Sequence, residues 1–226
     1  MGAVSLQNLS GFTLLESPTK VKNLAENAKK KGYSAIALTD INITYGLVDF
    51  YKAAKDTGIK PLLGMQLRIN GLIDEANKYD LIVIAKDDQG YKNILRLSSA
   101  VNLLTENGEK ENILTFENLK KYLGHLILIT PSNLHSELKM LQTNNPKMGA
   151  NYLRKLQDSL PSSSSMYLGV YADSGQQEYI NYIRSLATQF GLPLTAVEDG
   201  QYLNCNEQFL RRTLQAIKTN THLENI

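Results

Sequence analysis

The sequence predicts an α/β fold, a seven-stranded parallel β/α barrel of the distorted TIM type formed by a single domain over residues 1–226. Seven short apolar runs alternate with segments whose apolar residues recur at helical spacing. Parallel strands joined by helical crossovers either close into a barrel or stack as a doubly wound sheet. A chain of 226 residues with 42% hydrophobic content can bury one large core. Of the two architectures we favour the barrel.

The first helix has clear boundary signals. Its apolar residues keep the i, i+3, i+4, i+7 spacing from Val21 to Ala28, and Ser17 and Pro18 are suited to the N-cap and the first helical position. Lysines 29–31 follow, and cations in a last turn offset the helix dipole. This basic run therefore indicates a helix end rather than a contact with DNA.

The strands are predicted from short apolar runs bounded by turn residues. Residues 35–38 are apolar throughout, which is typical of a strand buried on both faces of a parallel sheet. The first strand ends within residues 5–10, and the others are predicted at 35–38, 60–67, 81–85, 126–129, 166–170 and 194–197. Further helices are predicted near 47–54 (ended by Gly58), 91–101, 116–122, 134–141, 152–160, 180–190 and 210–217.

Composition excludes several classes of protein. The 24 basic residues are nearly balanced by 22 acidic ones, and a net charge of +2 is too weak a signature for nucleic-acid binding. The single cysteine, Cys205, makes no internal disulfide and no zinc site. No long apolar run and no signal pattern is present, so we expect a cytoplasmic protein that makes no contact with membranes.

The loops after the predicted strands carry a resemblance to a known family. The segments concerned are Phe12 with Leu14-Leu15, Ala35 to Asp40, Gly46, Phe50 to Ala53, Gly58 to Gly64, Gly90 to Leu95 and Asp199 to Leu203. In this order and spacing they resemble the N-terminal polymerase-and-histidinol-phosphatase (PHP) domain of bacterial DNA polymerase III α subunits. The resemblance implies a PHP-type barrel of seven parallel strands, whose active members bind up to three metal ions through histidines and carboxylates.

The residues at the family's ligand positions are degenerate in this chain. The family's His-x-His pair falls on Gln7 and Leu9, with Ser5 upstream; its Thr-Asp-His-Gly becomes Thr39-Asp40-Ile41-Asn42; its glutamate after the third strand is Gln66; and its Asp-x-His is Asp199-Gly200-Gln201. Asp40 and Asp199 alone retain a carboxylate at these positions. We therefore expect no metal cluster, no cofactor and no catalytic residue.

Two other interpretations of these carboxylates stay open. Asp40, Glu198 and Asp199 form a weak candidate site for Mg²⁺ or Ca²⁺, since both ions prefer oxygen ligands. In the simpler interpretation, Asp40 caps a turn and Asp199 bonds loop amides. The three histidines, His125, His135 and His222, lie away from the predicted strand ends.

The resemblance implies that this domain belongs to a replicative DNA polymerase III α chain and is an excised N-terminal part of it. The parent chain would be a DNA-directed DNA polymerase, a nucleotidyltransferase acting in DNA replication, whereas this domain has a structural or docking role. Its partners would be the rest of the α chain, and a proofreading exonuclease or other replisome subunits. The alternative is a metal-dependent phosphoesterase or 3′–5′ proofreading nuclease with a reduced metal site. A third hypothesis is a stand-alone protein-binding module.

Overall fold

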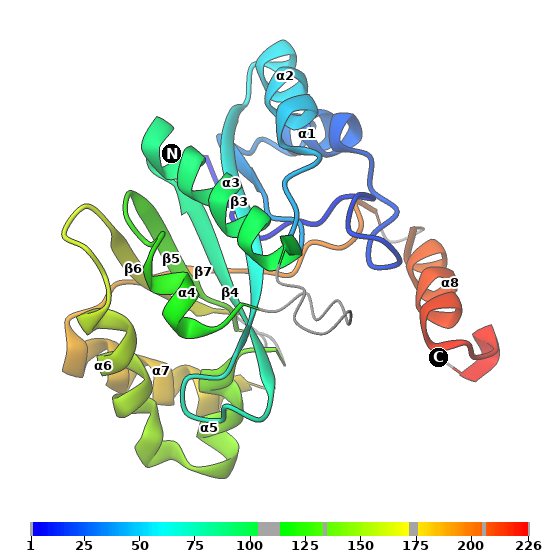
Figure 1. The fold of residues 1–226 in the computed structure, drawn as a ribbon. Coiled ribbons are helices and arrows are strands. Elements are labelled where there is room, and N and C mark those ends of the chain that lie inside the picture. The colour runs from blue at the N-terminus through cyan, green and yellow to red at the C-terminus, as the bar shows by residue number, and fades with distance from the viewer. Residues whose placement is uncertain (1, 104–113, 133–134, 172–175, 205–206, 226) are drawn as a thin grey trace. The chain divides into compact units, whose positions relative to one another are not determined.

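A computed structural model describes residues 2–103, 114–132, 135–171, 176–204 and 207–225 (Figure 1). The chain divides into two compact units: the first comprises Met1–Met65 and Glu198–Ile226, and the second comprises Gln66–Val197. Hydrogen bonding orders seven strands, β1 to β7, in sequence order, and β3 (Lys60–Asn70) contributes residues to both units. The single-domain assignment stays a prediction.

The first unit is built from short parallel strands covered by two helices. β1 (Val4–Ser5) pairs in parallel with β2 (Ala35–Leu38), which pairs in parallel with the first part of β3. The predicted burial of residues 35–38 on both faces is confirmed, because all four are buried. α1 (Val21–Lys30) and α2 (Leu47–Thr57) pack side by side (Figure 1). The unit also contains α8 (Gln208–Thr219) and the short η4 (Leu223–Asn225).

The predicted start of the first helix is wrong. α1 begins at Val21 with Lys20 as its N-cap, three residues after Pro18. The hydroxyl of Ser17 instead donates to the Leu9 carbonyl at 3.1 Å and accepts the N–H of Thr19 at 3.2 Å. Ser17 is therefore used in a turn that ties the chain before α1 back to the segment after β1.

The second unit combines a mixed sheet with amphipathic helices, each of which buries its own apolar side. β5 (Leu126–Thr130), β6 (Ser165–Val170) and β7 (Leu194–Ala196) are parallel neighbours. α5 (Glu137–Asn144), α6 (Gly149–Asp158) and α7 (Gln177–Phe190) pack together, as Figure 1 shows. The remaining elements are β4 (Lys78–Ala85), α3 (Asp88–Leu103), α4 (Phe116–Lys120) and η1 (Pro146–Met148).

The prediction that all strands are parallel is wrong, because β4 runs antiparallel to β5, with Ile82 opposite Ile129 and Ala85 opposite Leu126. The connection between β3 and β4 covers only residues 71–77. A parallel crossover needs about a dozen residues or more. The chain therefore reverses direction at this connection, and the sheet is mixed.

A buried carboxylate stabilises this reversal. Glu137, at the first position of α5, is 1% exposed and accepts the backbone N–H groups of Leu72, Ile73 and Asp74 at 2.7–2.9 Å. Lys155 of α6 also donates to the carbonyl of Leu72 at 2.9 Å. Polar groups of two helices thus satisfy backbone groups of the connection, which would otherwise be costly to bury.

Within the described ranges, the structure has no helix that is long and apolar enough to cross a membrane. The prediction for Cys205 concerns a residue outside the described part of the chain.

The end of α2 provides a test of the backbone geometry. Gly58 lies in the left-handed region at φ +67°, and a Cβ there would meet only the Lys29 Nζ, at 3.9 Å. We expect Gly58→Ala to lower the free energy of unfolding by about 1–2 kcal/mol through backbone strain alone. Urea unfolding measures this change. Gly58→Asn is the matched control and should cost less, because asparagine tolerates this conformation. Equal costs for both variants would contradict the argument.

Candidate functional site

Three of the four segments that carry predicted site residues lie together in the first unit. Beyond β1 and β2, Asn8 and Thr39 stay paired: the Asn8 N–H donates to the Thr39 hydroxyl at 3.0 Å, and the Thr39 N–H donates to the Asn8 carbonyl at 2.9 Å. On the other side of this segment, the Gly200 N–H donates to the Gln7 carbonyl at 3.0 Å, and the Leu9 N–H donates to the Gly200 carbonyl at 2.9 Å. These three segments therefore lie beside one another where β1 and β2 end.

The absence of a side chain at Gly200 is required for this pairing. A Cβ at Gly200 would lie 2.4 Å from the Asn8 Oδ1 and 3.0 Å from the Gln7 carbonyl oxygen. The Asn8 amide is itself fixed, since it donates to the Ser5 hydroxyl at 2.9 Å and to the Ala37 carbonyl at 3.0 Å. The backbone at Gly200 therefore lies in direct contact with Gln7 and Asn8, in the segment that follows β1.

Asp40 is a buried carboxylate that three donors surround. It is 2% exposed, and its Oδ1 accepts the Ser10 N–H and the Thr13 hydroxyl, each at 2.7 Å. Its Oδ2 accepts the Ser10 hydroxyl at 2.7 Å. Burial raises the pKa of Asp40, while these hydrogen bonds act in the opposite direction. The carboxylate thereby fixes the loop that follows β1.

The other predicted residues of this unit have different surroundings. Gln7 and Leu9 are 1% and 2% exposed. The Ile41 N–H donates to the Thr13 hydroxyl at 3.1 Å. The Oδ2 of Asp199 accepts the side-chain amide of Gln201 at 2.7 Å, and Glu198 is exposed. Among the residues that the structure describes, no three histidine, cysteine or acidic side chains are grouped so that they could hold a metal ion.

Gln66 is the fourth predicted position, and it lies in the second unit against a buried acid. Its amide donates to the Asp80 Oδ2 at 2.7 Å. Arg68 also binds Asp80, with Nε 2.9 Å from Oδ1 and Nη2 3.1 Å from Oδ2. The Asp80 side chain is fully buried, whereas that of Arg68 is 29% exposed. A bidentate guanidinium thus balances the charge of this carboxylate.

Asp80 is absent from the residues that the sequence reasoning identified. The predicted site residues all lie at the carboxyl ends of strands that were expected to run in one direction. Because β4 is antiparallel to β5, the first residues of β4 lie at the edge where β5 ends: the Asp80 N–H donates to the His135 carbonyl at 2.8 Å. A single acid inside an apolar run is the signal that would have identified it.

In the described part of the chain, none of the three histidines is grouped with the predicted site residues in a way that could bind a metal. His125 lies just before β5, with its Nδ1 2.8 Å from the Asp87 Oδ2. The hydrogen bonds that Asp87 accepts from the Gly90 N–H and forms with His125 lower the pKa of Asp87. His135 and His222 are both exposed.

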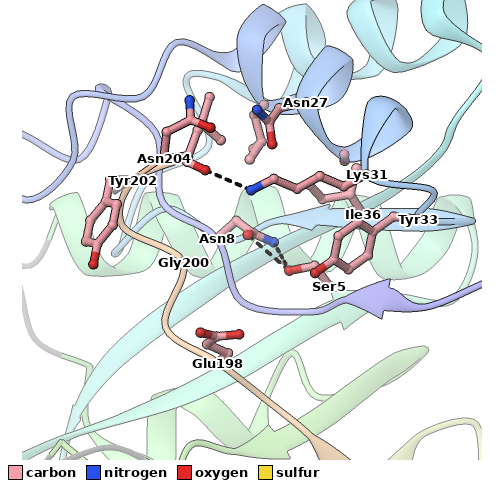
Figure 2. Close-up of a pocket in the computed structure, with 13 residues that line it drawn as sticks. Ser5, Asn8, Asn27, Lys31, Tyr33, Ile36, Glu198, Gly200, Tyr202 and Asn204 are labelled. Atoms are coloured by element: carbon pink, nitrogen blue, oxygen red, sulfur yellow. Dashed lines mark hydrogen bonds between the residues drawn. The ribbon is translucent and has the colours of Figure 1, made fainter. Parts of the chain in front are cut away.

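A pocket of about 440 Å³ lies beside these strand ends within the first unit (Figure 2). Its apolar floor comes from Leu24, Ala28 and Ile36, and its walls carry hydroxyl, amide and carboxylate groups. Lys31 reaches across it and donates to the Leu203 carbonyl at 2.8 Å, while Glu198 lies at its opposite end (Figure 2). Among the described residues that line the pocket, Glu198 is the only acidic one and there is no histidine or cysteine, so the lining does not form a ligand set for a metal.

Comparison with known proteins identifies the family. A family model described as the PHP domain matches residues 5–172. The DNA polymerase III subunit alpha of Bacillus subtilis is 31% identical over 223 residues, covering 99% of this chain and 20% of the relative. That of Aquifex aeolicus is 29% identical, covering 92% of this chain and 19% of the relative. This chain thus spans about a fifth of the length of these curated relatives.

Solved structures share the mixed α/β fold at low sequence identity. A proposed metal-dependent phosphoesterase from Bifidobacterium adolescentis matches with a TM-score of 0.58 and 13% identity, covering 88% of each chain. An amidohydrolase from Chromobacterium violaceum, solved with sulfate and no metal, matches with a TM-score of 0.59 and 12% identity, covering 88% of this chain and 87% of that chain. The family match, together with the similarity to polymerase chains over 99–100% of this chain, shows that this chain belongs to the PHP domain family and is homologous to the PHP domain of DNA polymerase III alpha subunits.

Proposed function

We propose that this chain is a structural PHP domain of a DNA polymerase III α chain, with no metal centre and no hydrolytic activity of its own. The observation that carries the proposal is the hydrogen bonding of Asp40. Its two oxygens accept three short hydrogen bonds from Ser10 and Thr13, so the carboxylate holds a loop. A metal ligand at this position would have to give up part of that network.

The chemistry of the neighbouring positions supports the same conclusion. Leu9 and Ile41 have no donor atom in their side chains, and the amides of Gln7 and Gln201 bring no charge to a hard cation. The charge of the buried Asp80 is already balanced by Arg68. Hydrolysis of a phosphoester by a metal mechanism needs an ion that activates a water molecule. The described residues supply no cluster that would bind such an ion.

The polymerase activity belongs, in this proposal, to parts of the parent chain outside residues 1–226. The matched relatives are DNA polymerase III α subunits about five times as long as this chain. We propose template-directed DNA synthesis in the cytoplasm as the activity of the parent chain. The domain contributes to its assembly with the rest of the chain and with a proofreading exonuclease.

One observation favours a second candidate function. A structural neighbour is a proposed metal-dependent phosphoesterase, and Asp40 and Asp199 still offer carboxylates. The alternative is therefore a phosphoesterase or 3′–5′ nuclease that binds a single Mg²⁺ or Ca²⁺ at Asp40, Glu198 and Asp199. Such a site would have to compete with the hydrogen bonds that Asp40 accepts.

A thermal scan with added metal separates the two candidates. We expect micromolar Zn²⁺ or Mn²⁺, and equally an excess of Mg²⁺ or Ca²⁺, to change the Tm of the protein by less than about 1 °C, because a ligand that does not bind the folded state cannot stabilise it. A rise of several degrees would contradict the proposal. Release of nucleotides from a single-stranded 3′ end, lost in Asp40→Asn, would establish the nuclease. Asp40→Asn suits this test because an amide retains most of the hydrogen bonds to Ser10 and Thr13.

The pH dependence of stability tests the surroundings of Asp40. Its pKa is raised in the folded state, so the folded protein binds this proton more tightly than the unfolded chain does. Stability from this group is therefore present below the unfolded pKa and decreases as the pH rises through the folded pKa. We expect the stability of Asp40→Asn, relative to that of the unsubstituted protein, to increase as the pH is raised from about 4 to 7. Urea unfolding across this range measures the difference.

The matched substitution in this series is Asp40→Ala. It leaves the buried donors of Ser10 and Thr13 without their acceptor, which we expect to cost about 3 kcal/mol of stability or more at any pH in that range. Equal stabilities of the alanine and asparagine variants would show that the hydrogen bonds to Asp40 do not hold the loop.

A further inference from the structure

The pocket of the first unit has no part in the proposed function, although its size suits a small molecule. Its volume of about 440 Å³ lies within the range of roughly 300–1,000 Å³ that is typical of ligand sites. The residues at the family's ligand positions, among them Gln7, Leu9, Asp40 and Gln66, are not the residues that line it. The pocket is therefore distinct from the place of the family's metal centre.

Hydrogen bonds hold two walls of the pocket in place. On one wall, the Asn8 amide donates to the Ser5 hydroxyl at 2.9 Å, and this hydroxyl donates back to the Asn8 Oδ1 at 3.1 Å. On another, the Leu203 N–H donates to the Glu207 Oε2 at 2.9 Å, and Lys31 donates to the Leu203 carbonyl. A site that is ordered before its ligand arrives loses less conformational entropy on binding.

The charges of the lining favour an uncharged ligand. Among the described residues that line the pocket, Lys31 is the only cation and Glu198 is the only acid. The Lys31 ammonium already donates to a backbone carbonyl, and Figure 2 shows Glu198 at the other end of the pocket. A polyphosphate is normally bound by several basic groups, and a divalent cation by several oxygen ligands. The lining offers neither set.

The apolar parts of the lining favour a ring. Leu24, Ala28 and Ile36 form the floor, and the side chains of Tyr33 and Tyr202 stand at opposite sides of the pocket (Figure 2). A ring compound can place a carbon-rich face on such a floor and stack on an aromatic side chain. The pocket thus suits a compact ring rather than an extended chain.

Three polar side chains of the lining are available to a ligand. In the described part of the chain, no hydrogen bond or ion pair engages the carboxylate of Glu198, the side-chain amide of Asn27 or the hydroxyl of Tyr202. A carboxylate accepts hydrogen bonds from adjacent hydroxyl groups, and an amide both donates and accepts. An acidic side chain that accepts from ribose hydroxyls is a common feature of nucleotide sites.

We propose that this pocket binds a neutral ring compound with adjacent hydroxyl groups, the chemistry that a free sugar and the ribose of a nucleoside share. Glu198 accepts the hydroxyl protons, Asn27 bonds a polar atom of the ring, and the carbon-rich face lies on the floor beside Tyr202. A domain without a metal centre can hold such a ligand, so the pocket does not depend on the proposed structural role.

Saturation-transfer difference NMR on the 226-residue protein tests the proposal. The probes are adenosine, methyl glucoside and 2′,3′-dideoxyadenosine, which keeps the base but lacks the adjacent hydroxyls. We expect adenosine, methyl glucoside or both to bind, and whichever binds identifies the source of the ring. Dideoxyadenosine should bind at least about tenfold more weakly than adenosine, because Glu198 then has no hydroxyl donors. Adenosine triphosphate should bind no more tightly than adenosine.

Substitutions with matched controls locate the binding site. Glu198→Gln and Tyr202→Ala should each weaken binding of the probe about tenfold, since one removes a charged acceptor and the other removes a stacking surface. Both side chains are exposed, so these changes should leave the fold intact. Glu26→Gln and Tyr51→Ala remove the same groups from α1 and α2 outside the pocket and should leave binding unchanged.

Several results would overturn the proposal. One is the absence of binding by both adenosine and methyl glucoside at probe concentrations of about 10 mM. Another is binding that Glu198→Gln and Tyr202→Ala both leave unchanged. Dideoxyadenosine that binds as tightly as adenosine, or a triphosphate that binds more tightly, would also contradict it. None of these results alters the thermal scan with added metal, so the proposed function and the pocket can fail separately.

Discussion

The arrangement of the first unit depends on one constraint, the burial of the Asp40 carboxylate. A buried charge is costly unless donors surround it, and here Ser10 and Thr13 provide them. These contacts give the loop after β1 a defined path. The burial of one acid is thus tied to the structure of the loop that follows β1.

The second unit solves a similar problem with a protein cation. Asp80 is fully buried, and Arg68 binds both of its oxygens while Gln66 adds a third hydrogen bond. Removal of one partner from such a pair is strongly destabilising, because the remaining charge stays buried. In both units, then, one buried acid, Asp40 or Asp80, is satisfied by hydroxyl, amide and guanidinium groups of the chain itself. This is the physical basis for the structural role that we propose for the domain.

Much of the fold was predictable because apolar runs and helical spacing are local signals. All seven strands and most helices occur near their predicted positions, including residues 35–38 and the helix ended by Gly58. The direction of β4 was not predictable from alternation, although the missing helix before residue 78 indicates it. That error concealed Asp80. The hydrogen bonds of Asp40 depend on Ser10 and Thr13, nearly thirty residues away in sequence, so periodicity carries no information about them.

The carboxylate of Glu137 has a consequence for the order in which the chain folds. It binds three consecutive amides that precede it by 63 to 65 residues. During synthesis, the turn between β3 and β4 leaves the ribosome well before its acceptor does, and its amides stay hydrated until α5 arrives. Domains are generally completed from the N-terminus as they emerge. The three hydrogen bonds from this turn to Glu137 can form only after the following strand and the start of α5 have been made.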